Sequence, residues 1–209
     1  AGVSVLSVGV NPGFVMDFLP LVFTGPCKNI EKIEIYRIMD ASTRRLAFQK
    51  KIGAGLSPEE YYKMRDEGKI RHVGLKESAG MIAHGVGWKL NRFEELVEPI
   101  VAEEDIEAGA LPVKKGFVAG TLQKARGITD DGQERIYMEM RMSIGQPDPR
   151  DTVKITGEPV IESTVSGGLH GDIATTALVI NSIKRIVEAP PGFYTPLDLP
   201  VATFRPAFD

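Results

Sequence analysis

The first 25 residues change from an unbroken apolar run to a helical pattern. Residues 3–10 show almost no alternation of apolar and polar positions, which is typical of a strand buried on both faces of a parallel sheet. Asn11-Pro12-Gly13 ends this run, and residues 14–23 then carry apolar side chains at helical spacing, with Pro20 as a kink. Strand, turn and helix form half of a βαβ unit. Either the start of the chain is processed, or a preceding domain holds the other strands.

The next stretch alternates apolar and polar positions. Residues 30–39 have the period of two that predicts a half-buried strand. Ser57 and Pro58 are typical of a helix start, because serine caps the free N–H groups and proline fits the first turn. Gly68 ends this predicted helix, and residues 76–84 predict another short helix.

From residue 117 onward the pattern predicts antiparallel sheet. Residues 117–128 and 134–144 flank Asp131-Gly132, a strong hairpin signal. Methionines recur at alternate positions of the second strand, where a sheet core is favoured over a soft binding surface. Residues 153–156 and 160–165 supply further strands.

The last regular element is a helix with little polar surface. It is predicted over residues 173–186 with Asp172 as its N-cap, and it must be buried on most sides or packed against a partner outside the chain. Residues 188–209 are rich in proline and predict an extended tail. We therefore expect an α+β fold: an open, largely antiparallel sheet with helices on one face over residues 26–187, preceded by a strand-turn-helix segment.

Composition narrows the classes of partner. The 209 residues are 43% hydrophobic and 25% charged, with a formal net charge of −3, so we expect no nucleic-acid partner. No apolar run approaches the ~18 residues that span a bilayer, and the start has no basic region of a signal peptide, so we expect no membrane partner. Cys27 is alone and no Cys/His spacing suits zinc, which predicts no metal and fits a cytoplasmic location.

The turn after the first strand is a candidate ligand site. No G-x-G-x-x-G or P-loop pattern occurs, so the chain has no phosphate cradle of its own. Ligands collect where parallel strands end and helices begin. Asn11 and the backbone of Gly13 could bind a nicotinamide carboxamide, or Pro12 and Gly13 could serve the turn alone; both interpretations stay open.

Several charged and titratable residues are further candidates. Arg37 stands among the apolar positions of a strand and must find a partner. Arg44-Arg45 could bind a carboxylate or a cofactor phosphate, although a solvated loop with ion pairs is favoured. His170 lies in a glycine-rich turn before the last helix and is the best histidine candidate for contacting a ligand; His72 lies in another short connection.

Taken in order, four groups of motifs resemble one family. They are Gly9 to Asp17, then Asp40 to Arg45 with Gln49 to Gly53, then Arg71 to Leu75 with Glu77-Ser78, and finally Gly168 to Asp172 with Ala174 to Ala177 and Asn181-Ser182. Together they resemble the 2,4-diaminopentanoate dehydrogenases and the related amine dehydrogenases, which are dihydrodipicolinate-reductase-like. The resemblance covers essentially the whole chain.

The resemblance implies an NAD(P)-dependent oxidoreductase that deaminates an amine by hydride transfer, reversibly, in amino-acid catabolism. A Rossmann domain of the same protein would bind NAD or NADP, residues 1–25 would be its last strand and connecting helix, and residues 26–187 would bind substrate and form a homodimer. The catalytic glutamate would lie upstream of Ala1, so we expect the isolated chain to be inactive.

The resemblance also assigns residues. Asn11, Pro12, Gly13 and Phe14 would flank the nicotinamide, and Arg37, His72, His170 and Thr175 would approach a pocket for a small amine or amino acid. Two alternatives stay open: a non-catalytic dimerisation or ligand-binding module of this fold, and a dihydrodipicolinate-reductase-like enzyme acting on a different imine or amine.

Overall fold

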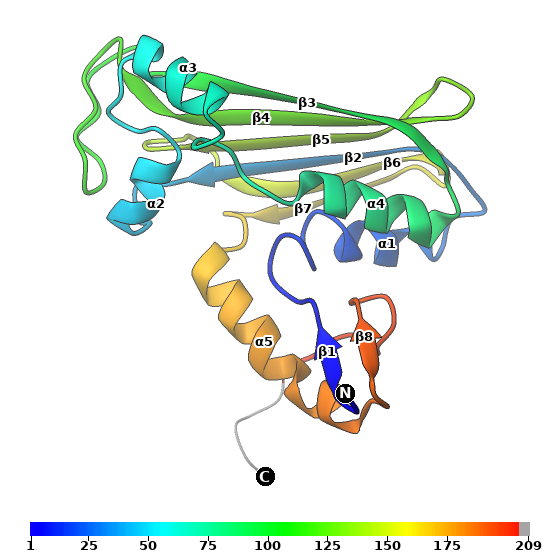
Figure 1. Cartoon of the computed structure of the whole chain (residues 1–209). Coiled ribbons are helices and arrows are strands. Elements are labelled where there is room, and N and C mark those ends of the chain that lie inside the picture. Colours follow the sequence, from blue (N-terminus) through cyan, green and yellow to red (C-terminus); the bar gives the residue numbers. More distant parts are fainter. Residues whose placement is uncertain (205–209) are drawn as a thin grey trace.

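A six-stranded mixed sheet forms the body of the computed structural model, which describes residues 1–204 (Figure 1). Its strands are β2 (Asn29–Asp40), β3 (Leu90–Val101), β4 (Val118–Thr129), β5 (Glu134–Ser143), β6 (Arg150–Glu158) and β7 (Ile161–Ser166), in the order β3-β4-β5-β2-β6-β7. Only β2 and β5 pair in parallel; every other neighbouring pair of this sheet is antiparallel. The predicted α+β class with a largely antiparallel sheet is confirmed.

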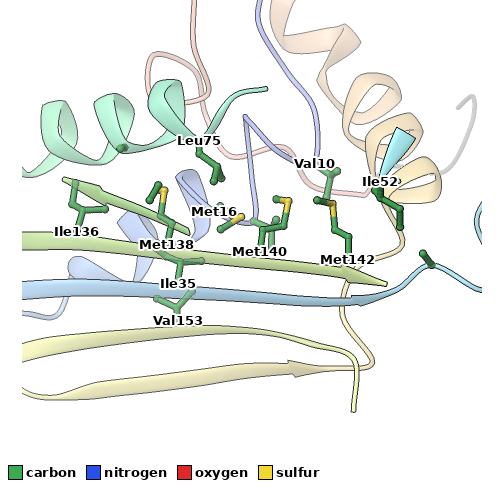
Figure 2. Close-up of a cluster of buried hydrophobic side chains, with 14 of the residues drawn as sticks. Val10, Met16, Ile35, Ile52, Leu75, Ile136, Met138, Met140, Met142 and Val153 are labelled. Atoms are coloured by element: carbon green, nitrogen blue, oxygen red, sulfur yellow. The ribbon is translucent and has the colours of Figure 1, made fainter. Parts of the chain in front are cut away.

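Four helices pack on one face of this sheet: α1 (Phe18–Thr24), α2 (Leu46–Lys51), α3 (Pro58–Asp66) and α4 (Leu75–Val86). The row of apolar side chains that points toward them is almost fully buried, with Ile35 1% and Met138 0% exposed. Figure 2 shows the three methionines of β5 beneath Leu75 and Met16. The methionine row is therefore core, as the alternation predicts.

A smaller unit stands apart from the sheet and contains both ends of the described chain (Figure 1). Strand β1 (Ser4–Leu6) pairs in parallel with β8 (Gly192–Tyr194), and α5 (Gly171–Glu188) lies against β1. We call β1, α5 and β8 the terminal unit. Of the predicted tail 188–209, residues 192–194 form β8, and residues 205–209 lie outside the described part.

Several predicted elements are corrected. The strand expected over residues 3–10 is regular only over Ser4–Leu6 and is partly exposed, because β8 is the neighbour it has in the described chain. The helix expected from Phe14 begins at Phe18, since Asp17 caps it and residues 11–17 form turns. The final helix begins at Gly171, with His170 at the N-cap position and no side-chain capping bond; Asp172 lies inside the first turn, where its carboxylate accepts hydrogen bonds from two arginines instead of capping the helix.

Two elements lack a clear signal in the sequence. Strand β3 contains four charged residues and Pro99, which do not alternate cleanly with apolar ones; it forms as the edge strand of the sheet, where charges and proline are tolerated. Helix α2 spans six residues and has no side-chain cap, so it is too short for a periodic pattern. By contrast, Ser57 forms the capping box of α3 with Glu60, as the Ser-Pro start predicts.

Candidate functional site

The carboxyl end of β2 opens into a hollow between the sheet and the start of α5. The hollow has a volume of about 230 Å³ and is formed by β2, the loop after it, the start of β6 and the turn before α5. We call it the Arg37 hollow. Its polar lining consists of Arg37, Asp40, Thr43, Arg44, Asp151 and His170.

Arg37 is the most deeply buried charge of this hollow. Its side chain is 2% exposed; Nη2 donates to the carbonyl of Leu169 at 2.8 Å and Nε lies 3.7 Å from Oδ1 of Asp151. Burial raises the pKa of Asp151, whereas the nearby guanidinium opposes this shift. Nη1 is buried and has no partner in residues 1–204. Nη1 is therefore the donor of this guanidinium that a ligand oxygen, such as one of a carboxylate, would satisfy.

The two arginines of the loop after β2, Arg44 and Arg45, differ in burial. Arg44 is 8% exposed, lies 4.3 Å from the centre of the Phe48 ring and donates to Asp172 at 3.1 Å, whereas Arg45 is exposed and reaches the same carboxylate at 3.3 Å. The sequence favoured a solvated loop with ion pairs for these arginines, and both of them do form ion pairs. Solvation applies only to Arg45, because Arg44 is buried and its Nε lacks a partner among the described residues.

His72 lies in a separate, narrow hollow beside Phe48, Lys51, Arg71 and Met142. The Asn11 backbone acts on its imidazole as a hydrogen-bond acceptor, and Nδ1 is buried and without a partner in residues 1–204. Burial, and then the positive charges of Lys51 and Arg37, lower the pKa of His72 to about 4. The imidazole is therefore neutral at pH 7.

The Asn11-Pro12-Gly13 turn leads toward the first helix and packs against the segment that carries His72. The Asn11-Pro12 peptide bond is cis, and Pro12 packs so closely on Gly74 that a Cβ atom there would lie 2.5 Å from Pro12 Cδ. Gly74 also has a φ of 125°, so only glycine fits. Both polar atoms of the Asn11 side chain are buried without a partner in the described chain. Phe14 lines a shallow hollow that continues past His170 along α5.

The remaining predicted residues lie at the start of α5. His170 lines the Arg37 hollow, and its Nδ1 is buried and unpartnered within residues 1–204. Thr175 does not line that hollow; its hydroxyl accepts a hydrogen bond from the Val10 N–H at 3.3 Å and so ties α5 to the turn. The geometry thus brings Arg37 and His170 together in the Arg37 hollow, whereas His72 lines a second hollow and Asn11 lines neither.

Three fully buried polar residues hold the loops of the site, and none of them was a sequence candidate. Asp17 accepts hydrogen bonds from the Gly13 N–H at 2.8 Å and the Ser78 hydroxyl at 2.7 Å. Gln49 donates to three carbonyls of the loop after β2, and Gln123 binds the peptide of His72. Each is 0% exposed. The sequence signal that could have identified these residues is a polar side chain at a position where the pattern expects an apolar one.

These observations define an α+β domain with a candidate site, in which buried arginines favour an anionic group and buried histidine nitrogens lack partners within residues 1–204. No group of three or more metal-ligating side chains occurs within residues 1–204, and no helix of that part is long and apolar enough to cross a membrane.

Sequence comparison identifies the family. The model of the 2,4-diaminopentanoate dehydrogenase C-terminal domain matches residues 14–205, and the chain belongs to this family. The 2,4-diaminopentanoate dehydrogenase of Acetoanaerobium sticklandii is 38% identical over 207 residues, which are 96% of this chain and 58% of that protein. An amine dehydrogenase of Streptomyces virginiae is 26% identical over 227 residues, covering 99% of this chain and 62% of that protein. The resemblance inferred from the motifs is confirmed.

A solved structure shares the fold. The amine dehydrogenase from Mycobacterium smegmatis matches with a TM-score of 0.85 and 18% identity, over 99% of this chain and 62% of that one. The chain therefore spans about three fifths of the length of these relatives.

Proposed function

We propose that this chain is the substrate-binding part of an NAD(P)-dependent amine dehydrogenase that acts on a small amine or amino acid. The observation that carries the proposal is the position of the unsatisfied polar atoms. All buried side-chain N and O atoms without a hydrogen-bond partner in residues 1–204 belong to Asn11, Arg37, Arg44, His72 and His170. Buried polar groups are normally paired, so their concentration here favours a ligand that supplies the partners.

The reaction is oxidative deamination. The amine-bearing carbon of the substrate would lose a hydride and its nitrogen a proton, which gives an imine; water would hydrolyse the imine to a ketone and ammonia, and the reverse is reductive amination. A bound nicotinamide supplies the hydride acceptor. The free amide of Asn11 offers both a donor and an acceptor, which fits a carboxamide, and Phe14 supplies an apolar surface beside it.

Arg37 and the histidines would hold the substrate. A carboxylate of the substrate would bind the free Nη1 of Arg37, and a donor group would bind Nδ1 of neutral His72 or of His170. The name of the relative, a diaminopentanoate dehydrogenase, describes a molecule with both kinds of group. Thr175 would act indirectly, through the Val10 peptide and the turn that carries Asn11.

The terminal unit supports a nucleotide-binding domain as the partner of this chain. A two-stranded parallel sheet is marginal alone. Val5 and Phe193 of this unit are 50% and 72% exposed, and Val3, which precedes β1, is 60% exposed. Helix α5 likewise exposes Ile173, Ile180 and Val187. These apolar surfaces suit further parallel strands and their helices. Because α1 packs on α4 and β2, we assign β1, α5 and β8, rather than all of residues 1–25, to the Rossmann domain.

We further propose that a homodimer forms through the face of the sheet that carries no helices. Its half-buried tyrosines, Tyr36 and Tyr137, lie 5.7 Å apart among ion-paired strand residues. At the usual strand spacing and rise per residue, six strands offer roughly 1,000 Å² per subunit, enough for the about 800 Å² per partner of a standard interface. Sedimentation analysis with a Tyr137→Glu variant tests this, and a monomeric wild-type chain contradicts it.

The test of the function joins this chain to the amino-terminal part of the Acetoanaerobium sticklandii relative that it does not match. We expect the joined protein to reduce NAD⁺ or NADP⁺ with 2,4-diaminopentanoate, and the 209-residue chain alone to be inactive. A panel of other amines and amino acids then defines the substrate. A joined protein that folds and binds the nucleotide but oxidises no amine contradicts the proposal and favours a non-catalytic module.

A matched pair of variants tests the assigned site. Arg37→Met combined with Asp151→Asn removes the guanidinium without leaving a lone buried charge. We expect the KM for the substrate to rise about 10- to 100-fold, the loss of one or two charge-assisted hydrogen bonds. Arg45→Met removes an exposed arginine from the neighbouring loop and should change KM less than about twofold.

A further inference from the structure

Gln123 is a polar side chain on the helix-covered face of β4, where the surrounding positions are core. It stands opposite Met140 of β5 and is 0% exposed. A glutamine there needs partners for one acceptor and two donors. It has all of them: Oε1 accepts from the His72 N–H at 2.8 Å, and Nε2 donates to the His72 carbonyl at 2.8 Å and to Oε1 of Glu95 at 2.7 Å.

This pair of bonds is the main constraint on the His72 peptide. No backbone-to-backbone hydrogen bond involves residues 71–73 in the described chain, although Ile70 is buried on one side of the segment and Gly74 meets Pro12 on the other. The side chain of Gln123 therefore does for His72 what a neighbouring strand does for a strand residue, because it binds both the N–H and the carbonyl.

The constraint continues through the imidazole. The Asn11 backbone acts as a hydrogen-bond acceptor toward the His72 ring, whose Nδ1 is buried and unpartnered within residues 1–204. Hydrogen bonds run from Glu95 on β3 through Gln123 to the His72 peptide, and the His72 ring then faces Asn11. These contacts join the sheet to the turn to which the nicotinamide is assigned.

We propose that Gln123 is a positioning residue of this site: by binding both the N–H and the carbonyl of the His72 peptide, it fixes the His72 imidazole beside Asn11, where the ligand is assigned. This inference rests on the proposed function only for the identity of the ligand. If Gln123 were purely structural, it would only supply hydrogen bonds to the His72 peptide. The function of the site would then not depend on the orientation of the imidazole ring.

The test is a histidine titration by NMR on the 209-residue chain, which needs neither cofactor nor turnover. The chain has three histidines, and a His72→Asn variant assigns the resonance of His72. In the wild type we expect a pKa of about 4, set by burial and by Lys51 and Arg37 against Glu77. Gln123→Met keeps the size of the side chain but releases the peptide, so the imidazole should gain water and its pKa should rise toward the ordinary 6.5.

Two controls separate release of the loop from loss of packing. Met138→Leu changes the same core face of the sheet without touching the His72 peptide, and Glu95→Gln keeps an acceptor for Gln123; both should leave the His72 pKa near 4. In the joined protein, Gln123→Met should also raise the KM for the amine by about 10- to 100-fold, the usual result of a small misplacement in a site.

The outcomes distinguish this inference from the proposed function. A folded Gln123→Met chain whose His72 still titrates near 4, and whose KM is unchanged, overturns the positioning role. If that variant does not fold, Gln123→Asn, which keeps an amide but cannot reach both groups, gives the same readout. If the joined protein never oxidises an amine, the proposed function fails, but the titration still decides the role of Gln123.

Discussion

Isoleucine side chains are buried in one region of the molecule, the sheet with its four helices, and exposed in the other, the terminal unit. In the sheet, Ile33 and Ile35 of β2 are 0% and 1% exposed. In α5, Ile173 and Ile180 are 69% and 55% exposed, although the two pairs of residues have the same chemistry. The sheet buries its apolar face against helices of its own chain, whereas the terminal unit has no such cover in residues 1–204.

The difference shows which part of the described chain covers its own apolar surface and which part leaves that surface exposed. A contiguous apolar surface on a helix is a sign of an interface, and burying it would stabilise a complex by about 25 cal/mol per Å². The proposed substrate residues of the sheet are already held by buried polar contacts, whereas the terminal unit has its apolar side free for the proposed nucleotide-binding domain. The candidate site lies where the sheet meets the start of α5.

The largest expected effect comes from the same substitution made in each unit. Ile35→Ala should destabilise the chain by about 2–5 kcal/mol, because it leaves a cavity in the core. Ile180→Ala should change the stability of the 209-residue chain by less than about 0.5 kcal/mol, because that side chain is mainly in water. Urea unfolding of both variants measures the difference, and equal losses would contradict the proposed contrast.

The next effect is a dependence of stability on pH that belongs to the sheet. Because the pKa of His72 falls from 6.5 to about 4 on folding, the unfolded chain binds the proton more readily between these values. Stability from this group is therefore fully present above pH 6.5 and is lost as the pH falls toward 4, by at most about 3 kcal/mol.

A variant isolates this term from those of other groups. His72→Asn should flatten the fall in unfolding free energy between pH 6.5 and 4 relative to the wild type. The matched control is His84→Asn, which changes an exposed histidine and should leave the slope unaltered. A wild-type slope that survives in His72→Asn would mean that the imidazole is not held in its buried, neutral form.

The smallest effect concerns the connection between the two units. Thr175→Val removes the hydroxyl that accepts from Val10 and should weaken the docking of α5 by about 1 kcal/mol. Thr176→Val is the matched control, because that exposed hydroxyl donates only to the Asp172 carbonyl of its own helix, and it should cost less than about 0.5 kcal/mol. Amide exchange in α5 measures both, and equal protection in the two variants would show that Thr175 does not join the units.

Sequence patterns predicted the elements whose signals are local. The Asp131-Gly132 hairpin, the alternating strand of Ile33 and Ile35, and the Ser57 cap each depend on residues close together in the chain. Strand β3 and the parallel pairing of β1 with β8 depend on neighbours far away in sequence, so no local period marks them. The N-cap of α5 was wrong for the same reason, because Arg44 and Arg45 engage Asp172 from another loop.

The candidate site divides in the same way. Arg37 could be found from the sequence because a charge interrupts an apolar strand face, and His170 because glycines surround it before a helix. The role of Gln123 could not, because its partner His72 lies 51 positions away and only the folded sheet brings them together. The same holds for Asp17 and Ser78.

Amide hydrogen exchange on the chain alone and on the protein joined to the unmatched part of its relative tests the two-unit account most directly. We predict that α5, β1 and β8 exchange rapidly in the chain alone and become strongly protected in the joined protein, while β2 and β5 are equally protected in both. Full protection of α5 in the isolated chain, or no gain in a joined protein that oxidises amines, would contradict the account.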